Sequence, residues 1–555
     1  MRRRQLLNTM AAIAAVSLSQ TTKTRAARAQ TTAPTHAFEH FALNRMGFGP
    51  QPGDIERVKA MGFEAYVAEQ LNPSDRGDDD CQQRLSAAEL PRRLWDDDVS
   101  GGTGQRLTSL DKPLSELWQL FIEEDVEDEI WIRPIVEVTA TTWIRAIYSR
   151  WQLQEVLVDF WHNHFNVNAY SDNLPIAVTW PFYDRTMRQN CLGNFREFLE
   201  AVAQSQPMLY YLDNVISRAS PANENYAREL FELHTLGADS YLNDQYQSPR
   251  DVPKLASGEP AGFIDEDIYE AARAFTGWTV ANGEEVGDEE FLPNTGAFHY
   301  QESWHDPYRK IVLGHEFPPN QPPLADGRKV LDLLAYHPGT ARHLCTKLCR
   351  RLVGDDPPQT LVEKAIATWT ENQRHPNQIQ HTVRTILLSP EFRNAYQQKV
   401  KRPFELLVSY LRATAAEVSP SLDLFWATES AGQILFGWPA PNGHPDTAQH
   451  WLSTNTLMSS WHALTTLTED ELPTVTFDWI GQMPQSLNTP RQVVDYWANR
   501  LIGQPLPEPS TRALMAFIAP EQATDQPFEA NRAELTERLT QLVPLIAMSP
   551  EFQWR

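Results

Sequence analysis

The sequence predicts a mainly α-helical protein, a multi-helical globular array with long loops and at most minor β structure. Two observations lead to this class. Apolar residues recur at helical spacing through most of the 555 residues, and the strict alternation that marks a half-buried strand is scarce. No long low-complexity linker divides the chain, so a single multi-helical domain is expected over residues 30–555.

The helical pattern is clearest in residues 151–161. The apolar side chains there are Leu153, Val156, Leu157, Phe160 and Trp161. Their spacing of i, i+3, i+4, i+7 and i+8 is the stripe of a helix that faces a core. Similar stripes predict helices in residues 194–203, 226–236, 267–275, 339–352 and 403–413. The best strand candidate is the short segment 310–314.

Long polar or proline-rich connections separate these helices, and connections of that length in a compact protein tend to be functional or mobile. They cover residues 72–82, 243–262, 281–297, 317–327, 438–448 and 503–510. A separate pattern, Ser-Pro-Glu-Phe, occurs at residues 389–392 and again at 549–552. Serine caps helices and proline suits the first helical position, so each copy predicts a corner between two helices.

Residues 1–29 predict an export signal that is removed from the mature protein. Three arginines at residues 2–4 precede an apolar stretch at residues 10–18, which is too short to span a membrane. Residues 27–29 are Ala-Arg-Ala, a cleavage site of the A-x-A type. Basic residues near such a site are typical of the twin-arginine route, and the alternative is an ordinary secretory signal. A periplasmic or extracellular protein is therefore expected.

The mature chain is strongly acidic. Removing residues 1–29 takes away six basic residues and no acidic ones, so the formal charge moves from −24 to about −30. A field of that sign repels phosphate backbones and anionic lipid headgroups, so nucleic-acid binding is not expected. No later apolar run approaches the roughly 20 residues that a transmembrane helix needs, so no stable membrane span is expected.

His162 and His164 lie in an aromatic run at residues 160–165 and are candidate metal ligands. Two arrangements are open. If the helix ends at Trp161 and the chain becomes extended, residues two apart point to the same face and can bind one ion. If the helix continues, the two side chains point about 200° apart and cannot share an ion. The non-functional alternative is a pair of histidines that hydrogen-bond neighbouring helices.

A second polar cluster lies in residues 223–237. Arg228 and Glu232 have the i,i+4 spacing of an ion pair on one helical face. Glu229 has no basic partner at helical spacing except its neighbour Arg228, which makes it the better candidate for a metal ligand. Glu232 is then the candidate catalytic carboxylate. The alternative is that the whole cluster forms one satisfied internal network.

His305 and Asp306 form a third candidate. A histidine can act as a base that a carboxylate orients, but adjacent residues rarely face each other, so a partner elsewhere is needed. Asp306 is alternatively the cap of a turn at Pro307. The phosphate-loop, dinucleotide, nucleophile-elbow and His-Glu-x-x-His motifs are absent from the sequence, which argues against kinases, Rossmann enzymes and the familiar hydrolases.

Several segments together resemble one known family. They are residues 41–50 (FALNRMGFGP), 160–165 (FWHNHF), 223–237 (NENYARELFELHTLG), 272–278 (ARAFTGW), 305–306 and 401–405 (KRPFE). Over nearly all of its mature length the chain is similar to the domain-of-unknown-function 1800 family (DUF1800) of exported bacterial proteins. The resemblance implies export and a partner from an adjacent exported phosphatase-like or sulfatase-like family. It implies no activity, and residues 281–297 form an unusually long insertion.

The function expected from these residues is that of a metal-dependent, hydrolase-like exported enzyme. The expected ligands of a divalent metal are His162, His164 and Glu229. The expected catalytic groups in the same pocket are Glu232, His305 and Asp306. The alternative function is a non-enzymatic scaffold or binding partner for a co-expressed exported protein or a glycan. Seventeen tryptophans, several of them near predicted loops, favour a carbohydrate ligand, whereas core packing accounts for most tryptophans.

Overall fold

The structure, a computed structural model, describes residues 38–555 except residues 75, 95–103, 124–127, 288, 469–473, 521–525 and 528–531. The predicted export signal at residues 1–29 lies outside the described residues. Over the described part the mainly α class is confirmed, because helices dominate and the strands form only two-stranded antiparallel pairs. No helix in these ranges has the length and apolar character that crossing a membrane requires.

The helices follow one another along the chain with short 3-10 turns between some of them. Those before residue 300 are α2 (Phe38–Met46), α3 (Asp54–Met61), α4 (Phe63–Gln70), α5 (Asp79–Ala87), α6 (Leu114–Ile122), α7 (Asp128–Tyr148), α8 (Gln152–His164), α9 (Leu174–Asn190), α10 (Phe195–Ala203), α11 (Gln206–Tyr211), α12 (Asn225–Glu229), the π-helix η2 (Leu230–His234) and α13 (Asp265–Phe275). Those after it are α14 (Ala325–Ala335), α15 (Pro338–Leu352), α16 (Gln359–Glu371), α17 (Gln378–Leu387), α18 (Pro390–Arg393), α19 (Pro403–Ala413), α20 (Leu422–Trp426), α21 (Ala448–Trp451), α22 (Thr454–Thr468), α23 (Pro490–Ile502), α24 (Glu508–Ile518), α25 (Arg532–Ala547) and α26 (Pro550–Gln553).

The strands pair as β1 (Glu89–Leu90) with β2 (Gln105–Arg106), β3 (Trp278–Asn282) with β6 (Asn294–Tyr300), β4 (Glu285–Gly287) with β5 (Glu290–Phe291), β7 (Lys310–Val312) with β8 (His315–Phe317), and β9 (Glu417–Val418) with β10 (Val475–Thr476). The strand predicted at residues 310–314 is therefore shorter than expected. It ends because Leu313 and Gly314 both have positive φ and form a two-residue turn into β8.

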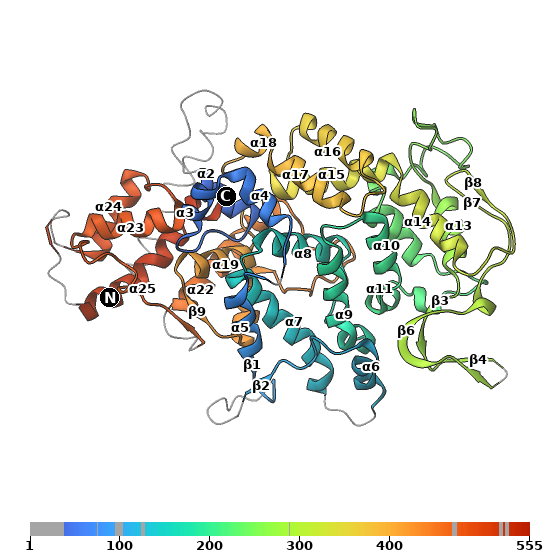
Figure 1. Ribbon diagram of the computed structural model, residues 1–555, viewed down its shortest axis with the longest axis horizontal. Helices are drawn as coiled ribbons and strands as arrows, with labels where there is room; N and C mark the ends of the chain where they lie inside the picture. The colour runs from blue at the N-terminus through green and yellow to red at the C-terminus, as the bar shows by residue number, and fades with distance from the viewer. Residues whose placement is uncertain are drawn as a thin grey trace.

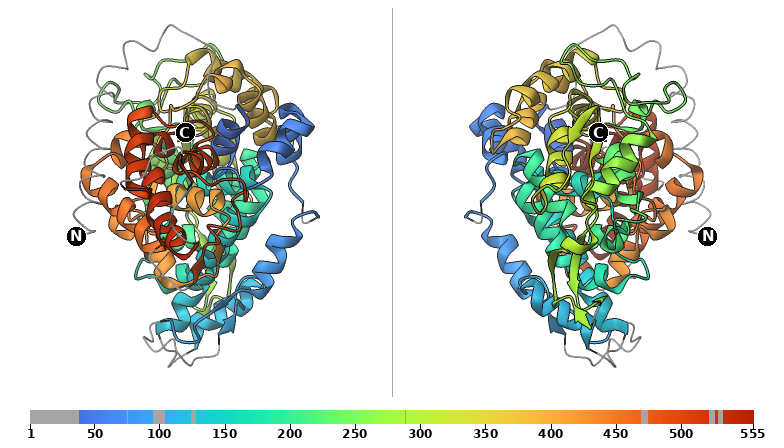
Figure 2. Two further views of the ribbon diagram at one scale, coloured as in Figure 1. Left: turned by 90° about the vertical axis from the view of Figure 1, so that its left-hand side faces the viewer. Right: turned by 90° about the vertical axis from the view of Figure 1, so that its right-hand side faces the viewer.

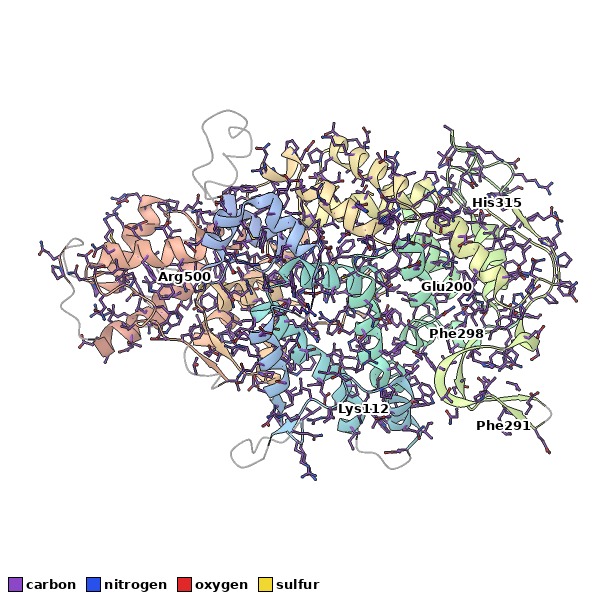
Figure 3. All side chains as sticks on the ribbon, viewed as in Figure 1. Lys112, Glu200, Phe291, Phe298, His315 and Arg500 are labelled. Atoms are coloured by element: carbon purple, nitrogen blue, oxygen red, sulfur yellow. The ribbon has the colours of Figure 1, made fainter. Side chains whose placement is uncertain are left out.

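The insertion at residues 281–297 is not the loop that its sequence predicts. It contains the last pair of the β3–β6 ladder, Asn282 with Asn294, and, beyond it, the β4–β5 hairpin that projects from the body in Figure 1. The glutamates of β4 and β5 are exposed to solvent, so the sequence lacks the apolar alternation of a half-buried strand. Phe291, labelled in Figure 3, lies exposed on this hairpin.

Helix α8 lies between two clusters of buried apolar side chains. Leu153 belongs to the larger cluster, which also takes in side chains of α9 to α17, and Val156 belongs to the second, built mainly from α7, α19 and α22 to α25. In Figure 2 the C-terminal helices face the viewer on the left and strands β3 and β6 on the right. The apolar stripe predicted in residues 151–161 is buried throughout, because α8 is covered on both sides.

The two corners predicted from Ser-Pro-Glu-Phe are confirmed. Ser389 separates α17 from α18, and its hydroxyl accepts the backbone N–H of Phe392 at 3.0 Å. Ser549 likewise separates α25 from α26, but its hydroxyl makes no capping hydrogen bond. The single-domain organisation expected for residues 30–555 stays a prediction.

Candidate functional site

His162 and His164 both lie on α8, which continues to His164 instead of ending at Trp161. The helical alternative of the sequence analysis therefore holds, and the two rings leave the helix on different faces. The Nε2 of His162 donates to the Asp184 carboxylate on α9 at 3.1 Å. Arg188 also donates to Asp184, at 2.8 Å. His162 thus joins a buried ion-pair network between α8 and α9.

The charges of this network compensate one another, as in an ion-pair network that stabilises the fold. Burial alone would raise the pKa of the Asp184 carboxyl, but the Arg188 guanidinium and the hydrogen bond from His162 hold it below its usual range. Arg188 also donates to Glu155 at 2.9 Å, so the positive and negative groups compensate each other. His162 therefore links two helices.

His164 points to a different set of groups. Its Nε2 donates to the carbonyl oxygen of His234 at 3.2 Å, and its Nδ1 accepts a hydrogen bond from the Lys347 ammonium at 2.9 Å. The rings of His234 and His343 lie beside it, with centroids 6.1 Å and 6.2 Å away. Burial and the nearby Lys347 charge hold the pKa of His164 well below its usual value, so its imidazole is neutral.

The π-helix η2 supplies the acceptors for two of these imidazoles. The last carbonyl groups of a helix have no partner within it, and here those of Leu233 and His234 accept from the Nε2 atoms of His343 and His164, each at 3.2 Å. Gly237 follows with φ of 90°, and a Cβ there would lie 2.6 Å from His343 Nδ1. The end of η2 therefore fixes the orientation of both rings.

Lys347 lies on α15, one turn after His343, and is half-buried. In the described part of the chain no carboxylate lies within ion-pair distance of its Nζ. Burial lowers the pKa of Lys347 to about 8, Asp446 opposes this shift and the Arg350 charge adds to it. An ammonium without a counter-ion in these surroundings is costly, which is why burial lowers this pKa.

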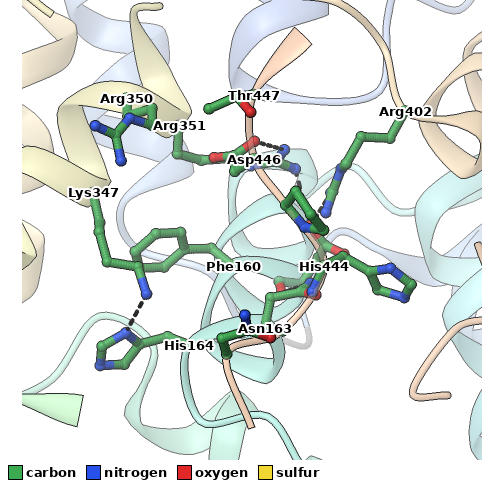
Figure 4. A pocket seen from close by; sticks show the side chains of 14 residues that line it. Phe160, Asn163, His164, Lys347, Arg350, Arg351, Arg402, His444, Asp446 and Thr447 are labelled. Atoms are coloured by element: carbon green, nitrogen blue, oxygen red, sulfur yellow. Dashed lines mark hydrogen bonds and ion pairs between the residues drawn. The ribbon is translucent and has the colours of Figure 1, made fainter. Parts of the chain in front are cut away.

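Lys347 lines a cavity of about 230 Å³, hereafter the Lys347 cavity, between α8, α15, the start of α19 and the loop at residues 442–447. Its charged lining consists of four cations and two carboxylates: Lys347, Arg350, Arg351, Arg402, Asp159 and Asp446. Figure 4 shows Lys347 reaching from α15 toward His164, with Phe160 beside it and Asp446 across the cavity.

Two of the four cations are compensated inside the protein. Asp159 accepts from Arg351 at 3.0 Å and from Arg402, and the fully buried Glu405 forms an ion pair with Arg351 at 2.6 Å. Asp446 pairs with Lys399 at 3.0 Å and lies 3.6 Å from Arg351. Among the described residues these carboxylates leave Lys347 without an ion-pair partner.

Arg350 is the second cation without a carboxylate partner among the described residues. Its Nε donates to the backbone carbonyl oxygen of Asp355 at 3.1 Å, and a neutral carbonyl does not balance the guanidinium charge. Lys347 and Arg350 therefore carry the uncompensated positive charge of the Lys347 cavity.

The loop at residues 438–447 is held against the end of α8. Asn166 donates to the carbonyl oxygens of Trp438 and Ala440 at 3.0 and 2.7 Å, and Asn163 accepts the backbone N–H of His444 at 3.0 Å. At Gly443 φ is 70°, and a Cβ there would overlap the carbonyl oxygen of Asn163. This loop, predicted as a long connection, forms one wall of the Lys347 cavity.

Glu229 and Glu232 lie outside the Lys347 cavity. The predicted pair between Arg228 and Glu232 is present at 3.2 Å, and Arg228 also contacts Glu224 and Asp265. The network is partly exposed, with 34% of the Arg228 side chain accessible, so it is not the buried pair that would cost most to break. Burial and then Glu232 raise the pKa of Glu229.

His305 and Asp306 belong to another buried cluster. The Nε2 of His305 donates to Asp326 at 3.3 Å, and Arg273 donates to Asp306 at 2.8 Å. Lys310 completes the cluster, since its Nζ contacts Asp326 at 2.8 Å. As expected for neighbours in sequence, the partners of His305 and Asp306 lie elsewhere.

The structure does not bring the six predicted site residues into one pocket. Only His164 lines the Lys347 cavity, while His162, the two glutamates and the His305 segment each belong to separate networks. Among the described residues there is no group of three or more histidine, cysteine, aspartate or glutamate side chains arranged to hold a metal ion. The three predicted metal ligands are thus not gathered around one point.

A comparison with protein families identifies the family of the chain. Residues 41–554 match the model of a family described as "Protein of unknown function (DUF1800)". The chain belongs to the DUF1800 family. No curated protein and no solved structure matches it. Arg402 and Glu405, which border or support the Lys347 cavity, lie in one of the segments on which the family resemblance rested.

Sequence reasoning missed the central residue of the cavity, Lys347. The signal available was a basic group on the predicted helix 339–352, where Lys347, Arg350 and Arg351 stand close together in a strongly acidic chain. Arg351 and Arg402 were missed for the same reason as Lys347. Their significance depends on which carboxylates lie opposite, and those carboxylates come from distant segments.

Proposed function

We propose that this DUF1800 protein is an exported enzyme that acts on a small, anion-bearing substrate in the Lys347 cavity. One observation carries the proposal. Lys347 and Arg350 line the cavity without a carboxylate partner among the described residues, whereas Arg351 and Arg402 beside them are paired. A cation withdrawn from water is stabilised by an opposite charge, and here a bound anion would supply it.

The roles of the residues follow from their positions. Arg350 would hold the carboxylate or phosphate group of the substrate, because a guanidinium is suited to such planar or oxygen-rich anions. Lys347 would face the reacting carbonyl group, and its ammonium form would stabilise negative charge on the carbonyl oxygen. His164 would act as a positioning residue, since its Nδ1 accepts from Lys347 while its Nε2 is bonded to backbone.

Hydrolysis is the reaction class that we propose for this enzyme. A cation at the carbonyl oxygen makes the carbonyl carbon more reactive toward water, and such electrostatic stabilisation is commonly the largest contribution to acyl transfer. The cavity volume of about 230 Å³ suits a small molecule or one terminal unit of a larger one.

Anion binding tests the proposal directly. We expect inorganic phosphate, compared with chloride at equal ionic strength, to raise the melting temperature of the wild type, because a ligand of the folded state stabilises it. Lys347→Met and Arg350→Met should lose this increase. Arg342→Met is the matched control, since Arg342 is exposed on the same helix and carries the same charge. An equal increase in all four proteins would refute the proposed site, because phosphate would then act only through the solvent.

The predicted divalent metal has its own measurement. Elemental analysis of protein purified without chelator should find about one equivalent if a metal is bound, and His162→Ala, His164→Ala and Glu229→Gln should each reduce it. Metal that persists in all three variants would place the ion elsewhere. Absence of metal in the wild type, with no uptake of added zinc, iron, manganese or calcium, would end the metal prediction and leave the cationic cavity as the proposed site.

A further inference from the structure

The amine of Lys347 differs from the other buried lysines in its surroundings. Lys310 contacts Asp326 at 2.8 Å, and Lys399 contacts Asp446 at 3.0 Å and Asp355 at 3.1 Å. These two amines are tied to carboxylates. Their ammonium forms are structural.

Lys401 is the nearest comparison, because its Nζ donates to Ser409 and lies 3.6 Å from the centre of the Phe552 ring, with no carboxylate in ion-pair contact among the described residues. The cavity next to Lys401 is only about 10 Å³, however, which is enough for a water molecule at most. Lys347 therefore combines an amine without a counter-ion with room for an organic ligand.

We infer that Lys347 is an amine nucleophile that forms an imine with a carbonyl compound carrying a carboxylate or phosphate group. The inference rests on the anion site of the proposed function and names its substrate class. It replaces the electrostatic role of the Lys347 ammonium with covalent attack by the uncharged amine. It stands on the placement of Nζ in the Lys347 cavity, on the neutral acceptor His164 Nδ1 at 2.9 Å, and on the second unpaired cation, Arg350, on the same helix.

The two cations define the chemical ends of the ligand. Lys347 and Arg350 are at i and i+3 on α15, so their side chains leave the helix as neighbours, and both line the cavity. The proposed ligand is a keto acid or aldehyde acid, with its carbonyl carbon at Nζ and its anionic group at the guanidinium. Phe160, which also lines the cavity, offers an apolar surface to the carbon chain.

The chemical step balances without an oxidant or a reductant. The uncharged Nζ donates its electron pair to the carbonyl carbon, and the carbonyl π bond breaks to give a carbinolamine. The carbon–oxygen bond then breaks, and the oxygen leaves as water with the two hydrogen atoms that the amine carried. The product is a carbon–nitrogen double bond to Lys347, and water reverses the reaction.

The surroundings of the amine support this chemistry. Nζ borders the cavity, and in the described part of the chain no carboxylate lies within ion-pair distance that would hold it as an ammonium. His164 contributes as a positioning residue that holds Nζ on the cavity side of α15.

Reductive trapping tests the inference on the intact protein. We expect glyoxylate with sodium cyanoborohydride, which delivers hydride to the imine carbon, to add one carboxymethyl group at Lys347, located by peptide mass spectrometry. Labelling of Lys347 should exceed that of the exposed Lys364 by about a hundredfold, because the cavity holds the aldehyde acid beside Nζ. His164→Leu should weaken this labelling, because Nζ loses the acceptor that positions it.

Controls separate the amine from the anion site. Acetaldehyde has the carbonyl group but no anion, so it should label Lys347 much more weakly than glyoxylate does. Arg350→Met should remove that preference for glyoxylate, and Arg342→Met should keep it. Since the two aldehydes are compared on the wild type, the test does not depend on the folding of a variant.

The outcomes distinguish this inference from the proposed function. No preference for Lys347 over Lys364, in a protein that phosphate still stabilises, would overturn the imine and keep the anion site. Equal labelling by glyoxylate and acetaldehyde would overturn the anionic substrate class. Loss of both the phosphate effect and the selective labelling would overturn the proposed function together with the inference.

Discussion

At the scale of single residues, the character of the candidate site is set by which charges find a partner. Arg351 and Arg402 meet Asp159 at the edge of the Lys347 cavity, so their charges support structure. Among the described residues, the Lys347 ammonium hydrogen-bonds only the neutral His164. The same residue type therefore has a different chemical character at different positions, because burial and neighbours determine the relative stability of charged and neutral forms.

The neutral histidines around Lys347 should make the protein sensitive to acid. Burial, then Lys347, lowers the pKa of His343 to about 4, and the pKa of His234 is lowered to about 3. Below an ordinary histidine pKa of about 6.5 the unfolded chain binds protons that the folded chain does not, so stability falls as pH falls through that window.

His343→Gln should reduce this pH dependence. Between about pH 7.5 and pH 5 the wild type should lose more unfolding free energy than the variant does, by about 1–2 kcal/mol. Urea unfolding at the two pH values measures the difference. His375→Gln removes an exposed histidine and should behave like the wild type. Parallel losses in all three proteins would show that His343 takes up its proton in the folded state.

At the scale of elements, the cavity exists because a helix end and a loop meet closely. Asn163 and Asn166 near the end of α8 bond to the backbone of the loop at residues 438–447. The absence of a side chain at Gly443 allows the loop backbone to lie against the carbonyl oxygen of Asn163. The wall of the cavity is therefore fixed by backbone contacts and does not depend on a large side chain.

Gly443→Ala should force this loop away from α8. An alanine at residue 443 would suffer both backbone strain at positive φ and overlap of its Cβ with Asn163. Gly432 is the comparison, because its φ of 85° is also positive but the space around it is open. We expect Gly432→Ala to cost about 1–2 kcal/mol through strain alone. Gly443→Ala should cost about 1–3 kcal/mol more through overlap, as measured by urea unfolding, and should weaken the trapping of glyoxylate at Lys347. Equal losses of unfolding free energy for the two substitutions would show that the loop can move away from Asn163 at no cost in stability.

At the scale of the whole molecule, one buried carboxylate joins distant parts of the chain. Glu405 forms ion pairs with Arg351 at 2.6 Å, with Arg402 at 3.2 Å and with Arg555 at 2.7 Å. Burial would raise the pKa of Glu405, but these three guanidinium groups hold it well below its usual range. Arg45 lies nearby and donates to the carbonyl oxygen of Arg555, so early and late segments meet around this cluster.

Glu405→Gln should be strongly destabilising, because it keeps the shape of the side chain but leaves three buried cations without their shared anion. The expected loss of unfolding free energy is on the order of 3–5 kcal/mol. Glu417→Gln is the control, since Glu417 pairs with Arg84 at 2.7 Å but is 66% exposed, and should lose less than about 1 kcal/mol. Similar losses in urea unfolding would mean that water reaches the Glu405 cluster.

Export concerns the whole molecule as well, and it rests on residues 1–29. Changing Arg3 and Arg4 together to lysine should leave unprocessed precursor in the cytoplasm, because the twin-arginine route requires that pair. Fractionation and immunoblotting measure the precursor and the mature form. Normal processing of the double variant would instead indicate the general secretory route.

The sequence alone was sufficient to predict the helical class, the core-facing stripe of α8, the corners at Ser389 and Ser549, and membership of the family. These features depend on neighbouring residues, whose spacing is visible in the sequence. Local spacing also predicted the pair of Arg228 and Glu232, but not its partial exposure. The sequence also predicted residues 281–297 wrongly as a loop, because the solvent-facing strands there lack an apolar pattern.

Only the tertiary structure decided where the site lies. The sequence left open whether His162 and His164 share a face, and the continuation of α8 directed one ring to Asp184 and the other to Lys347. Its one signal for Lys347 was the basic group that this residue forms with Arg350 and Arg351, and that signal did not distinguish a site from a solvated surface. The physical reason is that a charge acquires its chemical character from burial and from groups distant in sequence, and these are known only once the chain has folded.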